Sequence, residues 1–239
     1  MPGIDDLASH HQTPTALRPL QGLTVLVVED SRFASEAVRL LCTRSGAQIR
    51  RADGLRAARK HLAVYHPSVL LVDVGLPDGT GLDLITGLAE TSPRIAVILG
   101  TSADPDMEKA VLAAGADGFI EKPIASLAQF QSAILRHLPA ERQPPQLRVV
   151  SEERIKPDRL AYQDDLVQVA GVLGSSQAED SVDYITQFLG GVARSARDED
   201  LDLAVRQLKQ LSATGAPLRP GLAALNAVVK DRLEQAGPI

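Results

Sequence analysis

The sequence predicts an α/β domain built on a parallel sheet, followed by an all-α domain. Strand-like and helical patterns alternate five times between residues 23 and 138, which is typical of a parallel sheet with helices on both faces. From Pro157 onward only helical spacing recurs, and 239 residues are enough for two small domains. The expected divisions are a flexible arm (1–20), the α/β domain (21–138), a linker (139–156) and the helical domain (157–239).

Short apolar runs mark the expected strands. They are rich in Val, Leu and Ile and are bounded by polar or turn-forming residues, as buried strands are. These runs cover residues 23–28, 69–72, 96–99 and 118–121. The helical patterns of this part of the chain fall near residues 31–45, 54–65, 81–91, 105–115 and 126–138.

Amphipathic patterns fill the C-terminal region. They cover about residues 160–173, 179–197, 199–213 and 220–235. The third pattern has one apolar face, formed by Leu201, Ala204, Val205, Leu208 and Leu211. Gly190 and Gly191 lie within the second pattern and could kink or break that helix, because glycine disfavours a helix interior. The region is therefore expected to form a helical bundle.

Acidic residues follow two of the strand-like runs. Asp73 ends one run and precedes a loop rich in Gly and Pro, while Glu29 and Asp30 follow another. Strands of a parallel sheet bring their carboxyl ends to one edge, where ligands bind in such folds. Three carboxylates gathered there repel each other unless a cation neutralises them, and few oxygen ligands suit Mg²⁺. A plainer alternative is that Glu29 and Asp30 cap the helix that starts near Ser31, and both interpretations can hold together.

A cation is expected at the same edge. Lys122 follows the run 118–121, so its ammonium can pair with a carboxylate or with a phosphoryl oxygen. A lysine before a proline is otherwise an ordinary surface charge. Its position at a strand end, together with the acids, favours the functional interpretation.

These residues together resemble the receiver domain of bacterial two-component response regulators. The resemblance runs from about residue 23 to 138 and rests on a combination of short motifs. They are Glu29-Asp30, Asp73 with Pro77 and Gly81, the turn at 114–117, Phe119, and Lys122-Pro123.

The resemblance implies a fold and a set of roles. It implies a five-stranded, doubly wound, flavodoxin-like sheet. Asp73 would be the phosphoacceptor, and Lys122 would contact the phosphoryl group. Mg²⁺ would be held by Glu29, Asp30, Asp73 and the backbone carbonyl of Gly75. Phe119 would be the aromatic switch residue, although an aromatic at a strand end is ordinarily part of the core.

One position departs from the family pattern. Counting back from Lys122 without gaps, the family's Thr or Ser falls on Gly100, and Thr101 occupies the next position. A shift of one residue would let Thr101 supply the hydroxyl. Otherwise the hydroxyl is missing, and phosphorylation is less tightly linked to the switch.

Composition restricts the function classes. The formal net charge of −5 gives no support for binding nucleic acid or an anionic membrane. No run reaches the roughly 20 apolar residues of a membrane span, and no signal peptide is apparent. Cys42 is the only cysteine, so no internal disulfide forms and a reducing cytoplasm is the simplest compartment. His10-His11 in the arm are expected to be solvated.

The helical domain shows a second, weaker resemblance. Residues 204–210 and 214–217 are similar to the segment around the active histidine of histidine phosphotransfer bundles. Arg206 stands where that histidine belongs, and Gln210 stands where a glycine is usual. Such a module would bind partners without carrying phosphate. An ordinary amphipathic helix accounts for the same pattern.

The sequence thus predicts a response regulator of a two-component phosphorelay. A sensor histidine kinase or a histidine phosphotransfer protein would phosphorylate Asp73, with Mg²⁺ as cofactor. The protein would not be an enzyme beyond slow loss of its own phosphate, and the helical domain would bind a downstream protein or form a homodimer. The alternatives are a pseudo-receiver scaffold that acts by binding alone and a transcription factor with an unrecognised helical DNA-binding domain.

Overall fold

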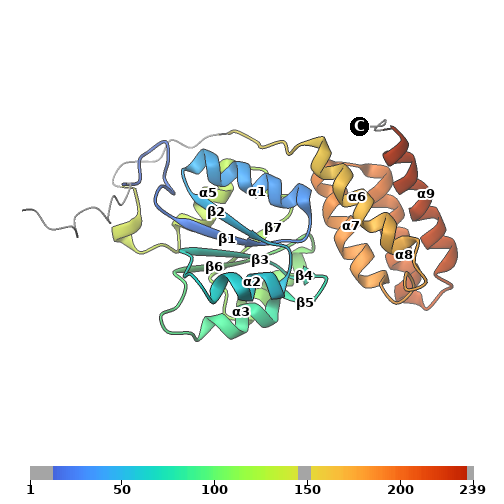
Figure 1. Ribbon diagram of the computed structural model, residues 1–239, viewed down its shortest axis with the longest axis horizontal. Coiled ribbons are helices and arrows are strands. Elements are labelled where there is room, and N and C mark those ends of the chain that lie inside the picture. The colour runs from blue at the N-terminus through green and yellow to red at the C-terminus, as the bar shows by residue number, and fades with distance from the viewer. Residues whose placement is uncertain (1–12, 145–151, 236–239) are drawn as a thin grey trace, which may run out of the picture.

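The computed structural model describes residues 13–144 and 152–235. An α/β domain and a helical domain lie side by side along the long axis of the molecule (Figure 1). His10-His11, the first part of the expected arm and the middle of the expected linker lie outside the described residues. Among the helices of the described ranges, none has the length and apolar character needed to cross a membrane.

The α/β domain is built on a parallel sheet with the strand order β2-β1-β3-β6-β7. Its strands are β1 (Thr24–Val28), β2 (Gln48–Ala52), β3 (Val69–Asp73), β6 (Val97–Ser102) and β7 (Gly118–Glu121). All four pairings between neighbouring strands are parallel. This order is the flavodoxin-like order that the resemblance implied, so the predicted fold class is confirmed.

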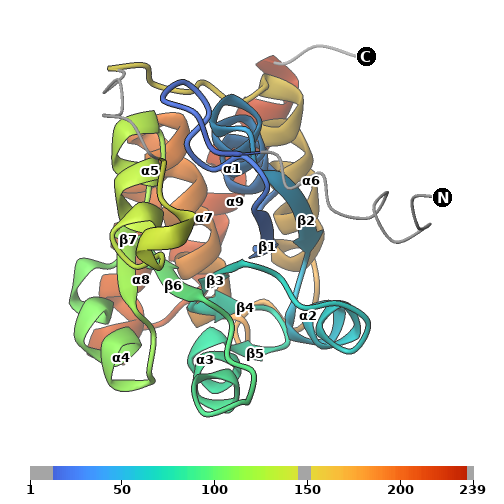
Figure 2. The same cartoon turned by 90° about the vertical axis from the view of Figure 1, so that its left-hand side faces the viewer.

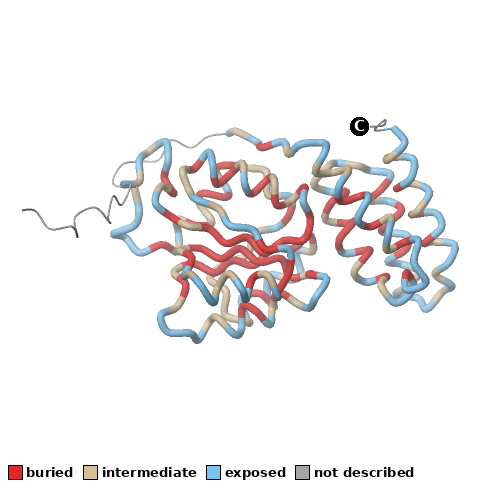
Figure 3. Tube along the Cα trace, viewed as in Figure 1, coloured by how far each residue is buried: buried red, intermediate tan, exposed pale blue. Residues whose placement is uncertain are grey.

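Helices cover both faces of this sheet (Figures 1 and 2). One face packs against α1 (Arg32–Ser45) and α5 (Leu127–Leu135). The other packs against α2 (Leu55–Leu62), α3 (Gly81–Ala89) and α4 (Glu108–Ala113). The pattern expected near 105–115 is divided, because the 3₁₀ turn Pro105–Met107 precedes α4. β1, β3 and β6 therefore lie between two apolar layers and are buried along most of their length (Figure 3).

Within residues 152–235, the helical domain consists of four helices around a core of its own. They are α6 (Arg159–Leu173), α7 (Val182–Ala196), α8 (Glu199–Thr214) and α9 (Arg219–Gln235). α7 runs unbroken through Gly190 and Gly191, so the break considered from the sequence does not occur. A Cβ at Gly190 would lie 3.5 Å from the Val205 side chain of α8. This is an ordinary van der Waals distance, and a Cβ at Gly191 would meet no atom within 4 Å.

Both connecting segments touch the α/β core at their described ends. Leu20, in the expected arm, is fully buried, and its amide donates to the Ser45 carbonyl at 3.0 Å. In the expected linker, Ile155 is buried against the sheet layer that contains α1 and α5. Arg154 also forms an antiparallel bridge with Ser126 at the start of α5. The chain is therefore anchored to the α/β domain until shortly before α6.

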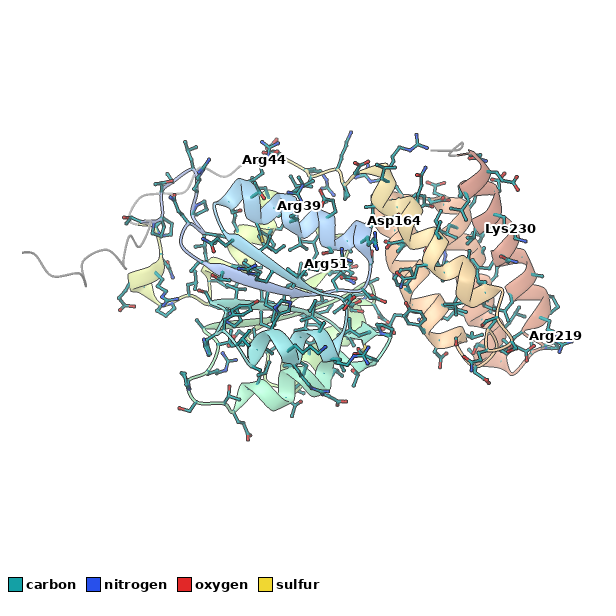
Figure 4. All side chains as sticks on the ribbon, viewed as in Figure 1. Arg39, Arg44, Arg51, Asp164, Arg219 and Lys230 are labelled. Atoms are coloured by element: carbon teal, nitrogen blue, oxygen red, sulfur yellow. The ribbon has the colours of Figure 1, made fainter. Side chains whose placement is uncertain are left out.

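The helical domain lies at the carboxyl edge of the sheet (Figure 1). α6 and α7 contact α1, and α7 also contacts the short strand β4 (Gly75–Leu76) that follows β3. Side chains reach across this boundary, and Asp164 of α6 lies where that helix faces the α/β domain (Figure 4). It pairs with Arg32 at 2.7 Å. The edge that the sequence marked as a candidate site is therefore also the boundary between the two domains.

Candidate functional site

Three acidic side chains meet at the carboxyl edge of the sheet. Glu29 and Asp30 follow β1, and Asp73 ends the neighbouring strand β3. One carboxylate oxygen from each of them lies within 4.8 Å of the other two, and all three residues are buried. We call Glu29, Asp30 and Asp73 the acid cluster. The proximity that the sequence predicted for these residues is present in the structure.

Lys122 joins the acid cluster from the end of β7. Its ammonium lies 2.6 Å from a Glu29 oxygen and 2.9 Å from an Asp73 oxygen, and the lysine is buried. One ammonium balances one of three carboxylates, so the fully ionised group carries an excess of negative charge. Asp30 instead accepts a hydrogen bond of 3.0 Å from the neutral Tyr184 hydroxyl of α7.

The pKa values of these groups reflect their crowding. Burial, followed by repulsion from Asp73, raises the pKa of Asp30 to about 7. Burial also raises the pKa of Glu29 to about 8, although the attraction of Lys122 opposes that shift. Burial alone would lower the pKa of Lys122, but the attraction of Asp73 and Glu29 outweighs it and raises that pKa. Glu29 and Asp30 would ionise more easily if further positive charge were brought to the cluster.

The donor chemistry fits a small hard cation. Carboxylate oxygens are the ligands that Mg²⁺ prefers, and a set of few protein ligands leaves coordination positions for water and a phosphoryl oxygen. The excess negative charge supplies the electrostatic attraction. Glu29, Asp30 and Asp73 are the residues that would hold the ion, with the Gly75 carbonyl in the adjoining loop as a further donor.

The loop after Asp73 is held by its own short hairpin. β4 pairs with β5 (Gly79–Thr80), and the Gly81 amide donates to the Val74 carbonyl at 2.8 Å. Asp78 at the tip accepts hydrogen bonds from the amides of Leu55 and Arg56 at the start of α2. These contacts fix the path of the chain past Gly75, where the resemblance places a backbone ligand.

Gly100 and Thr101 face opposite sides of the sheet. Thr101 is the strand partner of Asp73, and its buried hydroxyl donates to the Val72 carbonyl at 3.4 Å. Gly100 is the partner of Val72, and a Cβ there would lie 2.5 Å from the Val111 side chain of α4. Gly100 is therefore required by the packing of α4. Whether Thr101 serves the phosphoryl group stays a prediction.

Phe119 lies on β7 opposite Gly100. Its side chain is half-buried and packs against the core layer that contains α2, α3 and α4. This position fits the ordinary role of a core aromatic, and its proposed role as a switch stays a prediction.

The Glu29 carboxylate accepts a hydrogen bond from the amide of the N-cap residue Ser31 at 3.2 Å, and the first-turn amides of α1 are capped by two other residues. The Ser31 hydroxyl oxygen accepts a hydrogen bond from the Ala34 amide at 3.0 Å. Asp165 of α6 accepts hydrogen bonds from the amides of Arg32 at 2.7 Å and Phe33 at 3.1 Å, and from the Ser31 hydroxyl at 2.7 Å. A carboxylate at a helix N-terminus satisfies amides that have no partner within the helix.

The sequence did not single out Asp165 or Tyr184. A carboxylate in the middle of an amphipathic helix is ordinarily solvated, but Asp165 is fully buried at the domain boundary. The available signal was its position next to Leu166, on the side of α6 that is otherwise apolar. Arg206 of α8, which stands at the histidine position of the weaker resemblance, pairs with Asp202 at 3.0 Å and stays largely exposed.

Comparison with known proteins gives one family. Residues 25–134 match the family described as the response regulator receiver domain. The KDP operon transcriptional regulatory protein KdpE of Escherichia coli K12 is 31% identical over 116 residues, which cover 47% of this chain and 52% of that protein. The virulence transcriptional regulatory protein PhoP of Salmonella typhimurium is 33% identical over 102 residues, which cover 42% and 46%. The chain thus spans about half the length of these curated relatives.

Solved structures also resemble this part of the chain. A signal receiver domain of a signal transduction histidine kinase from Syntrophus aciditrophicus is 26% identical, with a TM-score of 0.44. The match covers 48% of this chain and 89% of that one.

Proposed function

Residues 25–134 form a response regulator receiver domain, and we propose that it takes up a phosphoryl group on Asp73. The observation that supports this proposal is the pairing of Lys122 with Asp73 inside the acid cluster. Glu29 also contacts the lysine, but among the three carboxylates only Asp73 ends the central strand β3. It combines a nucleophilic oxygen with an adjacent ammonium that can receive a phosphoryl oxygen.

The proposed reaction is a phosphoryl transfer from a phosphohistidine. An oxygen of the Asp73 carboxylate attacks phosphorus, an O–P bond forms, the donor's P–N bond breaks and the donor imidazole leaves as it takes up a proton. Lys122 neutralises charge on the transferred group, while Glu29 and Asp30 would hold the metal. Bound Mg²⁺ would supply further neutralisation of the phosphoryl oxygens. The donor class is therefore a sensor histidine kinase or a histidine phosphotransfer protein.

The product carries about −1.5 to −2 charges at neutral pH. Such a charge can bias an element with two arrangements and alter a distant surface. Slow hydrolysis of the aspartyl phosphate would return the domain to its starting state, and this is the extent of the enzymatic activity that we propose.

We propose that the helical domain is the output and that it binds a downstream protein or a second copy of the chain. Acidic residues outnumber basic ones in this domain, which disfavours contact with a nucleic-acid backbone. Its four helices enclose their own core, as expected of an independent interaction module. We propose a cytoplasmic location, as the lone buried Cys42 suits a reducing compartment.

A second candidate for the output is DNA binding. It is favoured by one observation, that KdpE and PhoP are named transcriptional regulatory proteins. The two outputs are separated by mixing the phosphorylated protein with duplex DNA at increasing salt. A complex that weakens steeply with salt supports the DNA-binding candidate.

Phosphorylation is tested with a small phosphodonor. The full chain is incubated with phosphoramidate and Mg²⁺, and its intact mass is followed. The expected result is one added phosphoryl group that is lost on treatment with base and is absent from Asp73→Asn. Asp83→Asn, an exposed carboxylate of α3, is the matched control. Equal labelling of Asp73→Asn and the wild type would refute the assignment, and a chain that binds Mg²⁺ without taking phosphate would favour the pseudo-receiver scaffold.

A further inference from the structure

α7 lies directly over the acid cluster. The Tyr184 hydroxyl donates to Asp30, as described above, and the Tyr184 ring is tilted against Phe188 with centroids 5.7 Å apart. One turn along the helix, the Gln187 amide packs against Gly75, so closely that a Cβ on this glycine would overlap with it. The helical domain therefore touches one acid of the cluster and the loop that follows another.

The space left beside Asp73 is small. The cavity bounded by the acid cluster, Lys122 and α7 has a volume of about 10 Å³. A single water molecule needs roughly this volume. A phosphoryl group adds a phosphorus and three oxygens, and a phosphohistidine must also approach with its protein attached. With α7 in place, neither the product nor a protein donor fits.

α6 also holds the helical domain against the α/β domain, through contacts with the first turn of α1. Asp165 accepts three hydrogen bonds from the first turn of α1, and its neighbour Asp164 pairs with Arg32. Ser31, Arg32 and Phe33 directly follow Glu29 and Asp30 in sequence. The helical domain is thus fixed to the same short segment that supplies two of the three acids.

We propose that the helical domain is a removable cap on the phosphoacceptor site, and that it must undock before Asp73 can be phosphorylated. This inference rests on the proposed function. Undocking frees Asp30 from Tyr184, opens the space beside Asp73 and uncovers the surfaces of α6 and α7 that now face the α/β domain. The uncovered surface, which includes Tyr184, Gln187 and Phe188, is then available to a downstream protein.

The cap and Mg²⁺ compete for Asp30. Tyr184 directs its hydroxyl at a carboxylate that would otherwise be free to hold the metal. Two ligands that oppose each other at one site weaken each other's binding by the same factor. Loss of the Tyr184 hydroxyl should therefore strengthen Mg²⁺ binding even when no phosphodonor is present.

The test compares single-atom and side-chain changes in the full chain. Tyr184→Phe removes only the hydroxyl and should take phosphate from phosphoramidate about tenfold faster, as hydrogen bonds to charged groups typically contribute about this factor. Tyr162→Phe is the matched control, because the Tyr162 hydroxyl bonds Asp198 within the helical domain. This control should react at the wild-type rate.

Asp165→Ala tests the second anchor. It should also accelerate phosphorylation, whereas Asp202→Ala on α8 should not. Hydrogen exchange gives a readout that does not depend on phosphate. The amides of Arg32 and Phe33, which donate to Asp165, should be protected in the wild type and exchange faster in Asp165→Ala.

The outcomes separate the cap from the proposed function. Equal rates for the wild type, Tyr184→Phe and Asp165→Ala would overturn the cap and leave phosphorylation of Asp73 intact. If no variant takes phosphate, the proposed function falls, and exchange at Arg32 and Phe33 still decides the cap. Stronger Mg²⁺ binding by Tyr184→Phe, together with faster exchange in Asp165→Ala, would support the cap. No change in either measurement would refute the cap.

Discussion

Lys122 lies 2.9 Å from Asp73, and the same ammonium lies 2.6 Å from Glu29. The lysine thus joins the ends of β1 and β3 across the carboxyl edge of the sheet from its own position after β7. Because all three side chains are buried, removing one partner of this bridge costs more than removing one partner of a surface ion pair.

Replacement of Lys122 by alanine should lower the free energy of unfolding. The variant leaves buried carboxylates without their cation, and breaking a buried pair in this way costs about 3–5 kcal/mol. Urea denaturation at pH 7 without divalent ions measures the loss. Arg39→Ala is the control, because it breaks the exposed pair with Glu36, which is worth about 0–1 kcal/mol. Equal losses in the two variants would show that Lys122 does not neutralise the acid cluster.

Stability without metal should fall as the pH rises through neutrality. The folded-state pKa of Asp30 is raised to about 7 and that of Glu29 to about 8, both well above their unfolded values. Acids of this kind bind protons more tightly in the folded state, so their favourable contribution is complete below about pH 4 and is lost as the pH rises to 8.

Asp30→Asn isolates this effect. With EDTA present, the variant should be more stable than the wild type at pH 8, by an amount on the order of 1–3 kcal/mol. The difference should shrink toward pH 5, where Asp30 is largely protonated. Urea denaturation across this range measures it, with Asp83→Asn as the exposed control. A gain that is the same at every pH would argue against a raised pKa at Asp30.

The sheet could be predicted from sequence where its strands are buried. β1, β3 and β6 lie between two layers of helices, so their residues must be apolar and their runs are easy to recognise. β2 was not recognised as an apolar run. It is an edge strand with the sequence QIRRA, and Gln48, Arg50 and Arg51 are exposed. An edge strand with one solvated side carries too few apolar residues to form a run.

The acid cluster could also be predicted from the sequence. Strand ends of a parallel sheet converge, so Glu29, Asp30 and Asp73 could be brought together before any coordinates were known. The docking of the helical domain was not predictable, because it depends on contacts between residues more than 130 positions apart, such as Ser31 with Asp165. No local pattern fixes how two separately folded domains meet.

Asp198 should be a main source of stability in the helical domain. It caps α8 by accepting a hydrogen bond from the Leu201 amide at 3.0 Å, and it also pairs with Arg232 of α9 at 2.7 Å. Asp198→Ala removes these contacts and the hydrogen bond from the Tyr162 hydroxyl, and it leaves a half-buried guanidinium with fewer partners, so a loss of about 2–4 kcal/mol is expected. Thermal unfolding measures it, and Asp231→Ala, which breaks exposed contacts with Arg232 and Gln235, should cost less than about 1 kcal/mol.

Replacement of Gly100 by a residue with a side chain, such as the Thr or Ser of the family pattern, is expected to lower the stability of the α/β domain. A Cβ at this position would lie 2.5 Å from Val111, so Gly100→Ala should destabilise the α/β domain by about 1–3 kcal/mol through overpacking. Gly87→Ala in α3 is the control, because a Cβ there meets no atom within 4 Å and should raise stability slightly through helix propensity.

The double variant Gly100→Ala/Val111→Ala tests the cause of that loss. If the clash with Val111 is responsible, shortening the valine should recover part of the loss, and the two changes should be non-additive by about 0.5 kcal/mol or more. Urea denaturation of both single variants and the double variant measures this coupling. Additive effects would mean that Gly100 is needed for another reason, such as its strand pairing with Phe119. The packing of α4 against this strand would then not be what excludes a side chain at position 100.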